Sequence, residues 1–208
     1  MKIGIMGGTF DPIHNRHRDI ALCARDEYGL DEIWFMPAGD PYCKEDKQVT
    51  PAAIRLEMTE AAVAEMPEFC RCSDIEVRTP GRTYTANTLR RLRELYPDDS
   101  FYFIAGADSI LYMDSWYEPE EIFRNAIVLC AERPGSEDEL METIVSLNKK
   151  YQRFGKERVR LIHCGEEPVS STDIRSMHER GGDISPYVAK GVLDLIERYG
   201  LYREPNNG

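Results

Sequence analysis

The chain has 208 residues, of which 42% are hydrophobic and 30% charged, and its formal net charge at pH 7 is -11. This length and composition predict an ordinary globular protein with one domain over residues 1–208. The negative charge argues against general nucleic-acid binding, which needs a basic face to neutralise phosphates. Any phosphate-binding site must therefore be local.

The sequence also predicts the compartment. No stretch approaches the roughly 20 apolar residues that a transmembrane helix needs, so no membrane partner is expected. Residues 1–5 lead directly into a strand without the pattern of a signal peptide, and we expect a cytoplasmic protein. The six cysteines form no C-x-x-C pair, which argues against a structural zinc site or a dithiol motif. Reduced thiols are expected.

Short apolar runs alternate with amphipathic segments along the chain. Such runs are typical of strands covered on both faces. We predict strands at residues 2–6, 32–36, 72–77, 100–105, 127–131 and 158–163. Strands that alternate with helices form a parallel sheet with right-handed crossovers. The predicted fold is therefore a doubly wound, Rossmann-like α/β fold with helices on both faces.

Caps and prolines delimit the predicted helices. One helix begins at Thr50-Pro51 and ends before Pro67, and others cover residues 84–96 and 173–180. A last helix runs from Ser185-Pro186 to Gly200, with its apolar positions facing inward, namely Val188, Val192, Leu195 and Ile196. Residues 165–203 thus form a small C-terminal helical part, and residues 204–208 are predicted to be a tail.

The segment GGTFDPIHNRH, residues 7–17, directly follows the first predicted strand. In an open parallel sheet this loop is the usual phosphate site. Gly7 and Gly8 let the backbone approach a phosphate closely, and the following helix directs free N–H groups at it. His14 and His17 lie one helical turn apart, so both rings could contact one phosphate.

Two histidines at this spacing have other interpretations. They could be surface imidazoles, or one of them could cap the turn. A zinc site is a third interpretation, but no third ligand of suitable spacing lies nearby in the sequence. We therefore assign no protein metal ligand.

Residues 7–17 resemble the signature GGTFDPxHxGH of the HxGH nucleotidyltransferase superfamily, in particular the bacterial nicotinate-nucleotide adenylyltransferases. Further segments extend the resemblance in the family's order and at similar spacing. They are DEIWFMPAG (31–39), RTYTANTL (82–89), FYFIAGADSI (101–110), SWY (115–117) and VSSTDIR (169–175). The resemblance covers nearly the whole chain, from Lys2 to about Tyr202.

The resemblance implies adenylyl transfer from ATP to nicotinate mononucleotide, which gives nicotinate adenine dinucleotide and pyrophosphate in NAD biosynthesis. Such a reaction depends mainly on positioning and on stabilising charge at the transferred phosphorus. His14 and His17 would be the catalytic pair. The implied cofactor is Mg²⁺, held mainly by the phosphates of ATP and by water. A homo-oligomer is left open.

By the same resemblance, ATP contacts the first loop, the end of the fourth predicted strand and the start of the helix at 173–180. In VSSTDIR, hydroxyls and helix N–H groups converge on an anion and an arginine adds charge. Taken alone, VSSTDIR favours a plain helix cap over a phosphate site. An aspartate after a strand could equally be a helix cap. The implied ATP-binding residues are Gly7, Gly8, Thr9, Phe10, Gly106, Asp108, Ser170, Ser171, Thr172 and Arg175.

The resemblance assigns nicotinate mononucleotide to the middle motifs. A tryptophan would stack on the pyridine ring, and backbone N–H groups would bind the nicotinate carboxylate. Taken alone, the tryptophan could equally be a core aromatic. The implied residues are Lys44, Tyr84, Thr85, Trp116 and Tyr117.

Arg16 stands where the family motif has glycine. The arginine could add charge to the triphosphate site, point to solvent, or fill space that a nucleotide needs. The alternative function is therefore a nucleotide-binding protein of the same fold with impaired turnover. Sibling enzymes that use phosphopantetheine or glycerol phosphate are a further alternative, but they lack this combination of middle and C-terminal motifs.

Overall fold

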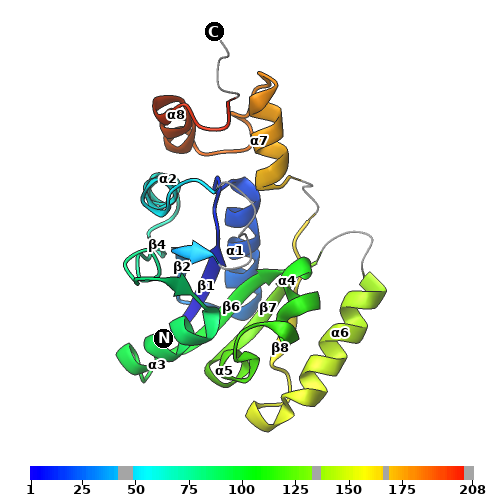
Figure 1. Cartoon of the computed structure of the whole chain (residues 1–208). Helices are drawn as coiled ribbons and strands as arrows, with labels where there is room; N and C mark the ends of the chain where they lie inside the picture. The colour runs from blue at the N-terminus through cyan, green and yellow to red at the C-terminus, as the bar shows by residue number, and fades with distance from the viewer. Residues whose placement is uncertain (42–48, 133–136, 166–168, 204–208) are drawn as a thin grey trace.

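The computed structural model describes residues 1–41, 49–132, 137–165 and 169–203 (Figure 1). Its main sheet has six parallel strands in the order β4-β2-β1-β6-β7-β8. The strands are β1 (Lys2–Gly8), β2 (Glu32–Pro37), β4 (Cys70–Cys72), β6 (Ser100–Gly106), β7 (Ala126–Ala131) and β8 (Val159–Ile162). The chain proceeds outward in one direction from β1 and in the other from β6, so the switch point lies between these two neighbours.

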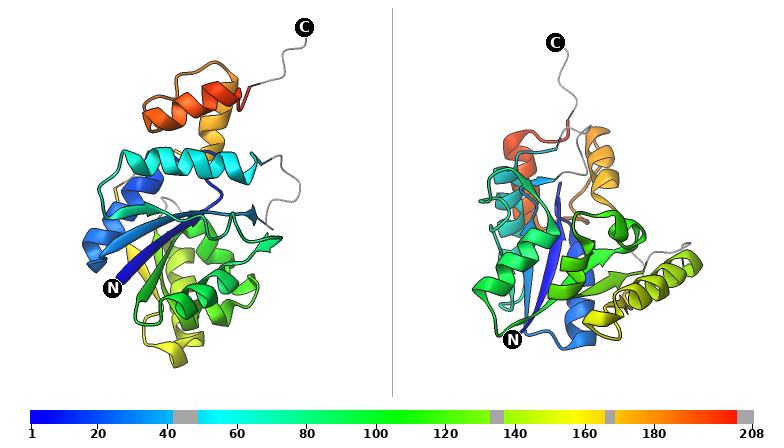
Figure 2. Two further views of the ribbon diagram at one scale, coloured as in Figure 1. Left: turned by 90° about the vertical axis from the view of Figure 1, so that its left-hand side faces the viewer. Right: turned by 60° about the horizontal axis from the view of Figure 1, so that its bottom comes forward.

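Helices cover both faces of this sheet, and a short parallel pair, β3 (Asp40–Pro41) and β5 (Arg82–Thr83), lies apart from it. One face carries α1 (Asn15–Tyr28), α2 (Ala52–Ala64), α7 (Ser171–Glu179) and α8 (Lys190–Tyr199). The other carries α3 (Thr85–Leu95), α4 (Ala107–Tyr112), α5 (Pro119–Asn125) and α6 (Glu137–Lys150). Short 3-10 turns follow α4 at Met113–Ser115 and α6 at Gln152–Phe154. The left view of Figure 2 shows the sheet between these layers.

The core is split by the sheet because successive side chains of a strand point to opposite faces. In β6, Phe101 and Phe103 pack with α3 and α5, whereas Tyr102 and Ile104 pack on the side of α1 and α2. Strands buried on both faces explain the continuous apolar runs of the sequence. The predicted doubly wound α/β fold is confirmed.

One predicted strand is wrong, because residues 72–77 do not continue the sheet. The strand in this region is Cys70–Cys72, and a turn follows at residues 75–78. The turn is held by local bonds, from the Arg78 N–H to the Asp74 carbonyl (2.9 Å) and from Thr79 Oγ1 to the Ile75 carbonyl (2.6 Å). An edge strand has one neighbour, so such local bonds compete well with further pairing.

The last helix begins later than predicted, at Lys190 rather than at Ser185-Pro186. Two carbonyls of the preceding turn bind the start of α1: Pro186 accepts from Asn15 Nδ2 (2.9 Å) and Tyr187 accepts from the Asn15 N–H (2.8 Å). Those carbonyls are therefore not available to a helix. The predicted inward positions are all buried, and α8 ends at Gly200 with a φ of 59°. No helix among the described residues is long and apolar enough to cross a membrane.

Candidate active site

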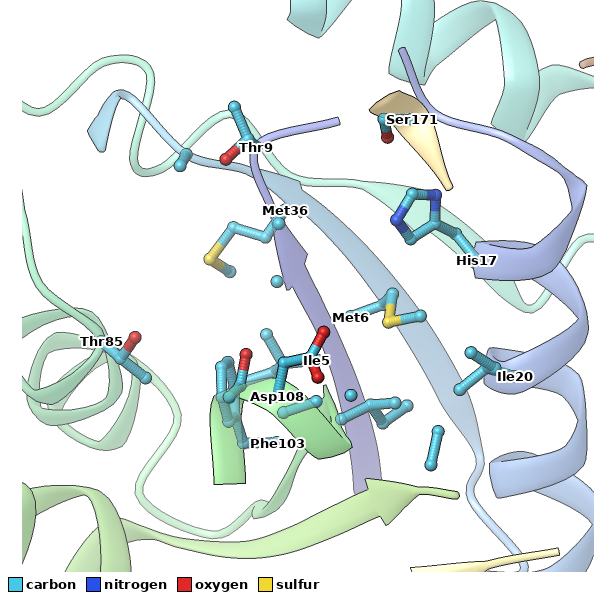
Figure 3. A pocket seen from close by; sticks show the side chains of 18 of the residues that line it. Ile5, Met6, Thr9, His17, Ile20, Met36, Thr85, Phe103, Asp108 and Ser171 are labelled. Atoms are coloured by element: carbon cyan, nitrogen blue, oxygen red, sulfur yellow. The ribbon is translucent and has the colours of Figure 1, made fainter. Parts of the chain in front are cut away.

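A cavity of about 950 Å³ opens at the carboxyl ends of β1, β6 and β7. This is the place where a doubly wound sheet binds ligands, and the volume is at the upper end of the range for ligand pockets. Figure 3 shows Thr85 of α3 on one side of the cavity, His17 and Ser171 on the other, and Asp108 of α4 between them. Segments far apart in the sequence thus border one space.

His14 and His17 both line the cavity at the start of α1. The backbone N–H of His14 lies 3.3 Å from Nδ1 of His17, and the ring centroids are 3.8 Å apart. Because Nδ1 of His17 accepts this bond, the ring proton of neutral His17 belongs on Nε2. The edge of the ring also packs against Phe10, with centroids 4.9 Å apart.

His14 is 6% exposed. Burial lowers its pKa to about 4, and the charge of Arg16 adds to this, whereas Asp173 opposes it. His14 is therefore neutral at pH 7. Its Nδ1 is buried and has no hydrogen-bond partner among the described residues.

The loop after β1 approaches the cavity through small residues. Gly7, Gly8 and Thr9 line it. A Cβ on Gly8 would lie 2.8 Å from the Phe10 ring, so a larger residue would have to displace that ring. Phe10 itself has a φ of 52° and is 2% exposed, because its ring turns back into the core. Its side chain therefore packs in the core beneath the loop and is not among the residues that line the cavity.

A buried arginine that the sequence analysis missed supports this loop. Arg55 of α2 is 1% exposed. Its guanidinium donates to four carbonyls at 2.7–2.8 Å, those of Thr9, Ala38, Gly39 and Thr50. The loops that follow β1 and β2 are thus tied to α2. An arginine within a helix is usually exposed, so the pattern carries no signal for this role.

The N-terminus of α7 forms another wall. Ser170 caps α7 in a capping box, because it accepts from the Asp173 N–H (3.2 Å) and its own N–H donates to the Asp173 carboxylate (2.9 Å). Ser171 Oγ donates to the Pro12 carbonyl over 2.9 Å. Ser170, Ser171 and Thr172 all line the cavity. The structure thus brings this helix end beside the first loop.

Arg175 is placed differently from these serines. It is not among the residues that line the cavity. One amino group donates to the Asp11 carbonyl at 2.7 Å, and the other donates to Thr172 Oγ1 at 3.2 Å. Arg175 therefore links α7 to the first loop without lining the cavity.

Aromatic residues and the start of α3 border the opposite side. Trp116 and Tyr117 line the cavity. Tyr84, the N-cap residue of α3, and Thr85, its first residue, line it as well. The rings of Tyr84 and Tyr117 have centroids 4.6 Å apart, and Trp116 meets Phe103 edge to face at 6.3 Å. The N-cap position of α3 makes no side-chain cap bond, so N–H groups of the first turn can serve an anion. The prediction for Lys44 lies outside the described residues.

Glu76 is a second residue that the sequence analysis missed on this side. It lines the cavity and accepts from Thr88 Oγ1 over 2.7 Å, and burial raises the pKa of its carboxyl. It lies in the turn that replaces the wrongly predicted strand, so the error in the strand concealed it.

Gly106 and Asp108 complete the rim, at the cap and in the first turn of α4. Arg16 also lines the cavity. Its Nη1 donates to the Gly165 carbonyl and lies 3.5 Å from Cys164 Sγ. Arg16 thus reaches from α1 to the connection between β8 and α7, and the cavity remains open beside it.

The comparison with protein families agrees with this geometry. The model of the family described as cytidylyltransferase-like matches residues 5–177. The chain belongs to this family. It is 38% identical over 202 residues to a probable nicotinate-nucleotide adenylyltransferase of Desulfitobacterium hafniense, which covers 97% of this chain and 96% of the relative. The corresponding protein of Lachnoclostridium phytofermentans is 36% identical and covers 97% and 98%. The family resemblance of the motifs is thereby confirmed.

Solved structures agree on the fold. A Plasmodium falciparum nicotinic acid mononucleotide adenylyltransferase complexed with NaAD matches with a TM-score of 0.76 and 24% identity, over 97% of each chain. A putative nicotinate-nucleotide adenylyltransferase of Vibrio parahaemolyticus matches with a TM-score of 0.67 and 22% identity, over 98% of this chain and 96% of the other. At these identities the likeness concerns the fold alone.

Proposed function

We propose that this chain is a nicotinate-nucleotide adenylyltransferase, which transfers the adenylyl group of ATP to nicotinate mononucleotide and releases pyrophosphate. One observation carries the proposal: the same cavity is lined by the starts of α1 and α7 and by Trp116 and Thr85. Two nucleotides can lie end to end in such a cavity. The names of the full-length relatives support the same substrates.

In the proposed reaction, an oxygen of the mononucleotide 5′-phosphate forms a bond to the α-phosphorus of ATP. The bond from that phosphorus to the bridging oxygen of the β-phosphate breaks, and pyrophosphate leaves. Nε2–H of His17 would donate to an oxygen of the transferred phosphate, because its Nδ1 is engaged by His14. Neutral His14 would add a second donor. The enzyme's contribution is positioning and charge stabilisation.

The ATP subsite would use the first loop and the α7 wall. Backbone N–H groups of Gly8 and Thr9 would approach the phosphates, and Ser171 and Thr172 would bind the β- and γ-phosphates. Asp108, which projects into the cavity, would accept from ribose hydroxyls. Arg175 would contribute through its charge and its bond to the first loop rather than by direct contact.

The mononucleotide subsite would use the opposite side. Trp116 would stack on the pyridine ring, and N–H groups at Thr85 and Tyr117 would bind the nicotinate carboxylate. An amide offers a weaker acceptor to such donors, so the acid is the expected substrate. Lys44 would add a phosphate contact.

Mg²⁺ would accompany the triphosphate. No cluster of three or more His, Cys, Asp or Glu that could hold a metal is found among the described residues. The carboxylates of Asp108 and Asp173 line the cavity separately. This donor set fits an ion held mainly by phosphate oxygens and water, and the ion would neutralise charge on the leaving pyrophosphate. We assign no side chain to it.

The remaining proposals concern the whole protein. Residues 1–208 would form one nucleotidyltransferase domain that acts in the cytoplasm on small molecules. Its net charge of -11 gives no support for a nucleic-acid partner.

The test is a product assay with ATP and Mg²⁺, run once with nicotinate mononucleotide and once with its amide. We expect equal amounts of dinucleotide and pyrophosphate, with the acid preferred. His163→Gln, which alters an exposed imidazole outside the cavity, serves as a matched control for His17→Gln. Binding of ATP without product would instead support the nucleotide-binding protein with impaired turnover.

A further inference from the structure

The charge of the cavity wall poses a problem for the proposed substrates. ATP and a mononucleotide are both polyanions, yet the carboxylates of Asp108, Glu132 and Asp173 line the cavity. Glu76 lines it as well, although burial raises the pKa of its carboxyl. Among the described lining residues, Arg16 is the one lysine or arginine. His14 does not offset this, because it is neutral at pH 7.

Arg16 lines the cavity together with the first residues of α7. It extends from the first turn of α1, and its Nη1 binds the Gly165 carbonyl. Gly165 lies five residues before Ser170, which caps α7. Arg16 thus extends from the positive end of α1 and lines the same cavity as Ser170, the cap residue of α7. An anion is favoured beside a helix N-terminus, and a cation alone is not.

Among the described residues, the hydrogen-bond partners of Arg16 do not neutralise its charge. Its two described partners are the Gly165 carbonyl and the Cys164 thiol, and both are neutral. Both contacts are made by Nη1. No ion pair between described residues involves Arg16. Its neighbour Arg18 differs, because Arg18 pairs with Asp19 at 2.8 Å and does not line the cavity. A cation fixed by a neutral partner at the start of a helix is suited to a multivalent anion.

We propose that Arg16 binds the polyphosphate of the donor nucleotide, with Nη1 anchored on Gly165 and the rest of the guanidinium directed at the β- and γ-phosphates. The inference rests on the proposed function and adds a substrate-binding residue to it. Negative charge grows on pyrophosphate as its bond to the α-phosphorus breaks. A fixed cation beside that group stabilises the transition state as well as bound ATP.

The experiment compares Arg16→Met with Arg18→Met, since both remove one positive charge from the same end of α1. Calorimetry measures binding of inorganic tripolyphosphate and of AMP, which lacks the β- and γ-phosphates. For Arg16→Met we expect tripolyphosphate affinity to fall on the order of tenfold or more, the effect typical of one charge-assisted hydrogen bond. AMP affinity should stay unchanged, and Arg18→Met should resemble the wild type. Arg16→Lys, which keeps the charge, should bind tripolyphosphate more tightly than Arg16→Met.

Three results would overturn the proposal. Wild-type affinity of Arg16→Met for tripolyphosphate would show that the guanidinium does not contact polyphosphate. Equal losses in both methionine variants would indicate a general charge effect. Parallel losses for AMP and tripolyphosphate would indicate a structural tether between α1 and Gly165. These outcomes are distinguishable from failure of the proposed function, which is judged by the absence of dinucleotide in the wild type.

Discussion

The backbone N–H of His14 donates to Nδ1 of His17 over 3.3 Å, and the two imidazoles lie with centroids 3.8 Å apart and planes tilted by 35°. The pair is therefore not symmetric. His17 supports the backbone at the start of α1 with one nitrogen and has its proton on the other, whereas His14 is the buried N-cap residue. Changes at the two positions should have different effects.

Replacing His17 tests the catalytic half of this arrangement. His17→Ala should reduce turnover by about a hundredfold or more, comparable to the loss of one oxyanion donor, with a much smaller change in ATP affinity. It should also lower the free energy of unfolding by about 0.5–1.5 kcal/mol, because the His14 N–H loses its acceptor. Steady-state kinetics and urea unfolding measure the two effects.

His17→Asn separates these two effects. The Asn Oδ1 can replace Nδ1 as the acceptor, so stability should return while turnover stays low. Should turnover also return with asparagine, the contribution of Nε2 to catalysis would be refuted and the role of His17 would be structural.

His14 makes stability depend on pH. Its pKa is about 4 in the folded protein and 6.5 when unfolded, so well above pH 6.5 both states are neutral. Below pH 6.5 the unfolded state binds a proton that the folded state does not, and the free energy of unfolding falls as the pH falls toward 4. The expected loss is about 2 kcal/mol between pH 7.5 and pH 5. His14→Gln removes the titration and should flatten this decline in urea unfolding.

His163 supplies the control for that measurement. It is exposed, and Glu27 raises its pKa, so its contribution to stability is greatest below pH 6.5 and is lost as the pH rises. His163→Gln should therefore leave the decline toward low pH as steep or steeper. A decline in His14→Gln as steep as in the wild type would mean that His14 is not the group responsible.

The location of the cavity was predictable from the sequence because parallel strands end at one edge of a sheet. The apolar pattern identifies the element boundaries that lie beside Gly7, Asp108 and Ser171. In the structure all three residues line the same cavity. The helix cap at Ser170 was equally readable, since the cap and its Asp173 partner are three residues apart.

Side-chain directions set by long-range contacts were not predictable. Phe10 turns into the core because its φ is positive, which is uncommon for a residue other than glycine. Arg175 turns away from the cavity toward a carbonyl 164 residues earlier in the chain, and Arg16 binds one 149 residues later. Periodicity identifies the face of a helix that is buried, but not which distant carbonyl an arginine on it will bind.

Trp116 tests the division of the cavity into two subsites. Trp116→Ala should raise KM for nicotinate mononucleotide and leave KM for ATP nearly unchanged, because ring stacking contributes about 0.5–1.5 kcal/mol beyond area burial. Trp116→Phe keeps a stacking ring and is the matched control. A selective rise in KM for ATP would reverse the assignment of the subsites.

Arg55 provides a prediction about the support of the site. Its guanidinium binds the carbonyls of Thr9, Ala38, Gly39 and Thr50, so Arg55→Met leaves four acceptors without their donor. An unsatisfied buried polar group costs about 1–3 kcal/mol, and we expect Arg55→Met to lower the free energy of unfolding by at least about 3 kcal/mol. Urea unfolding measures this loss.

Arg78→Met is the control for that loss, because Arg78 is exposed and its ion pair with Asp74 should contribute at most about 1 kcal/mol. The stability lost at Arg55 should be concentrated in the loops after β1 and β2, since three of the four carbonyls belong to them. Hydrogen exchange in those loops should therefore accelerate more than in α6, which Arg55 does not contact. Uniform acceleration across the chain would show that Arg55 stabilises the fold as a whole rather than the loops that border the cavity.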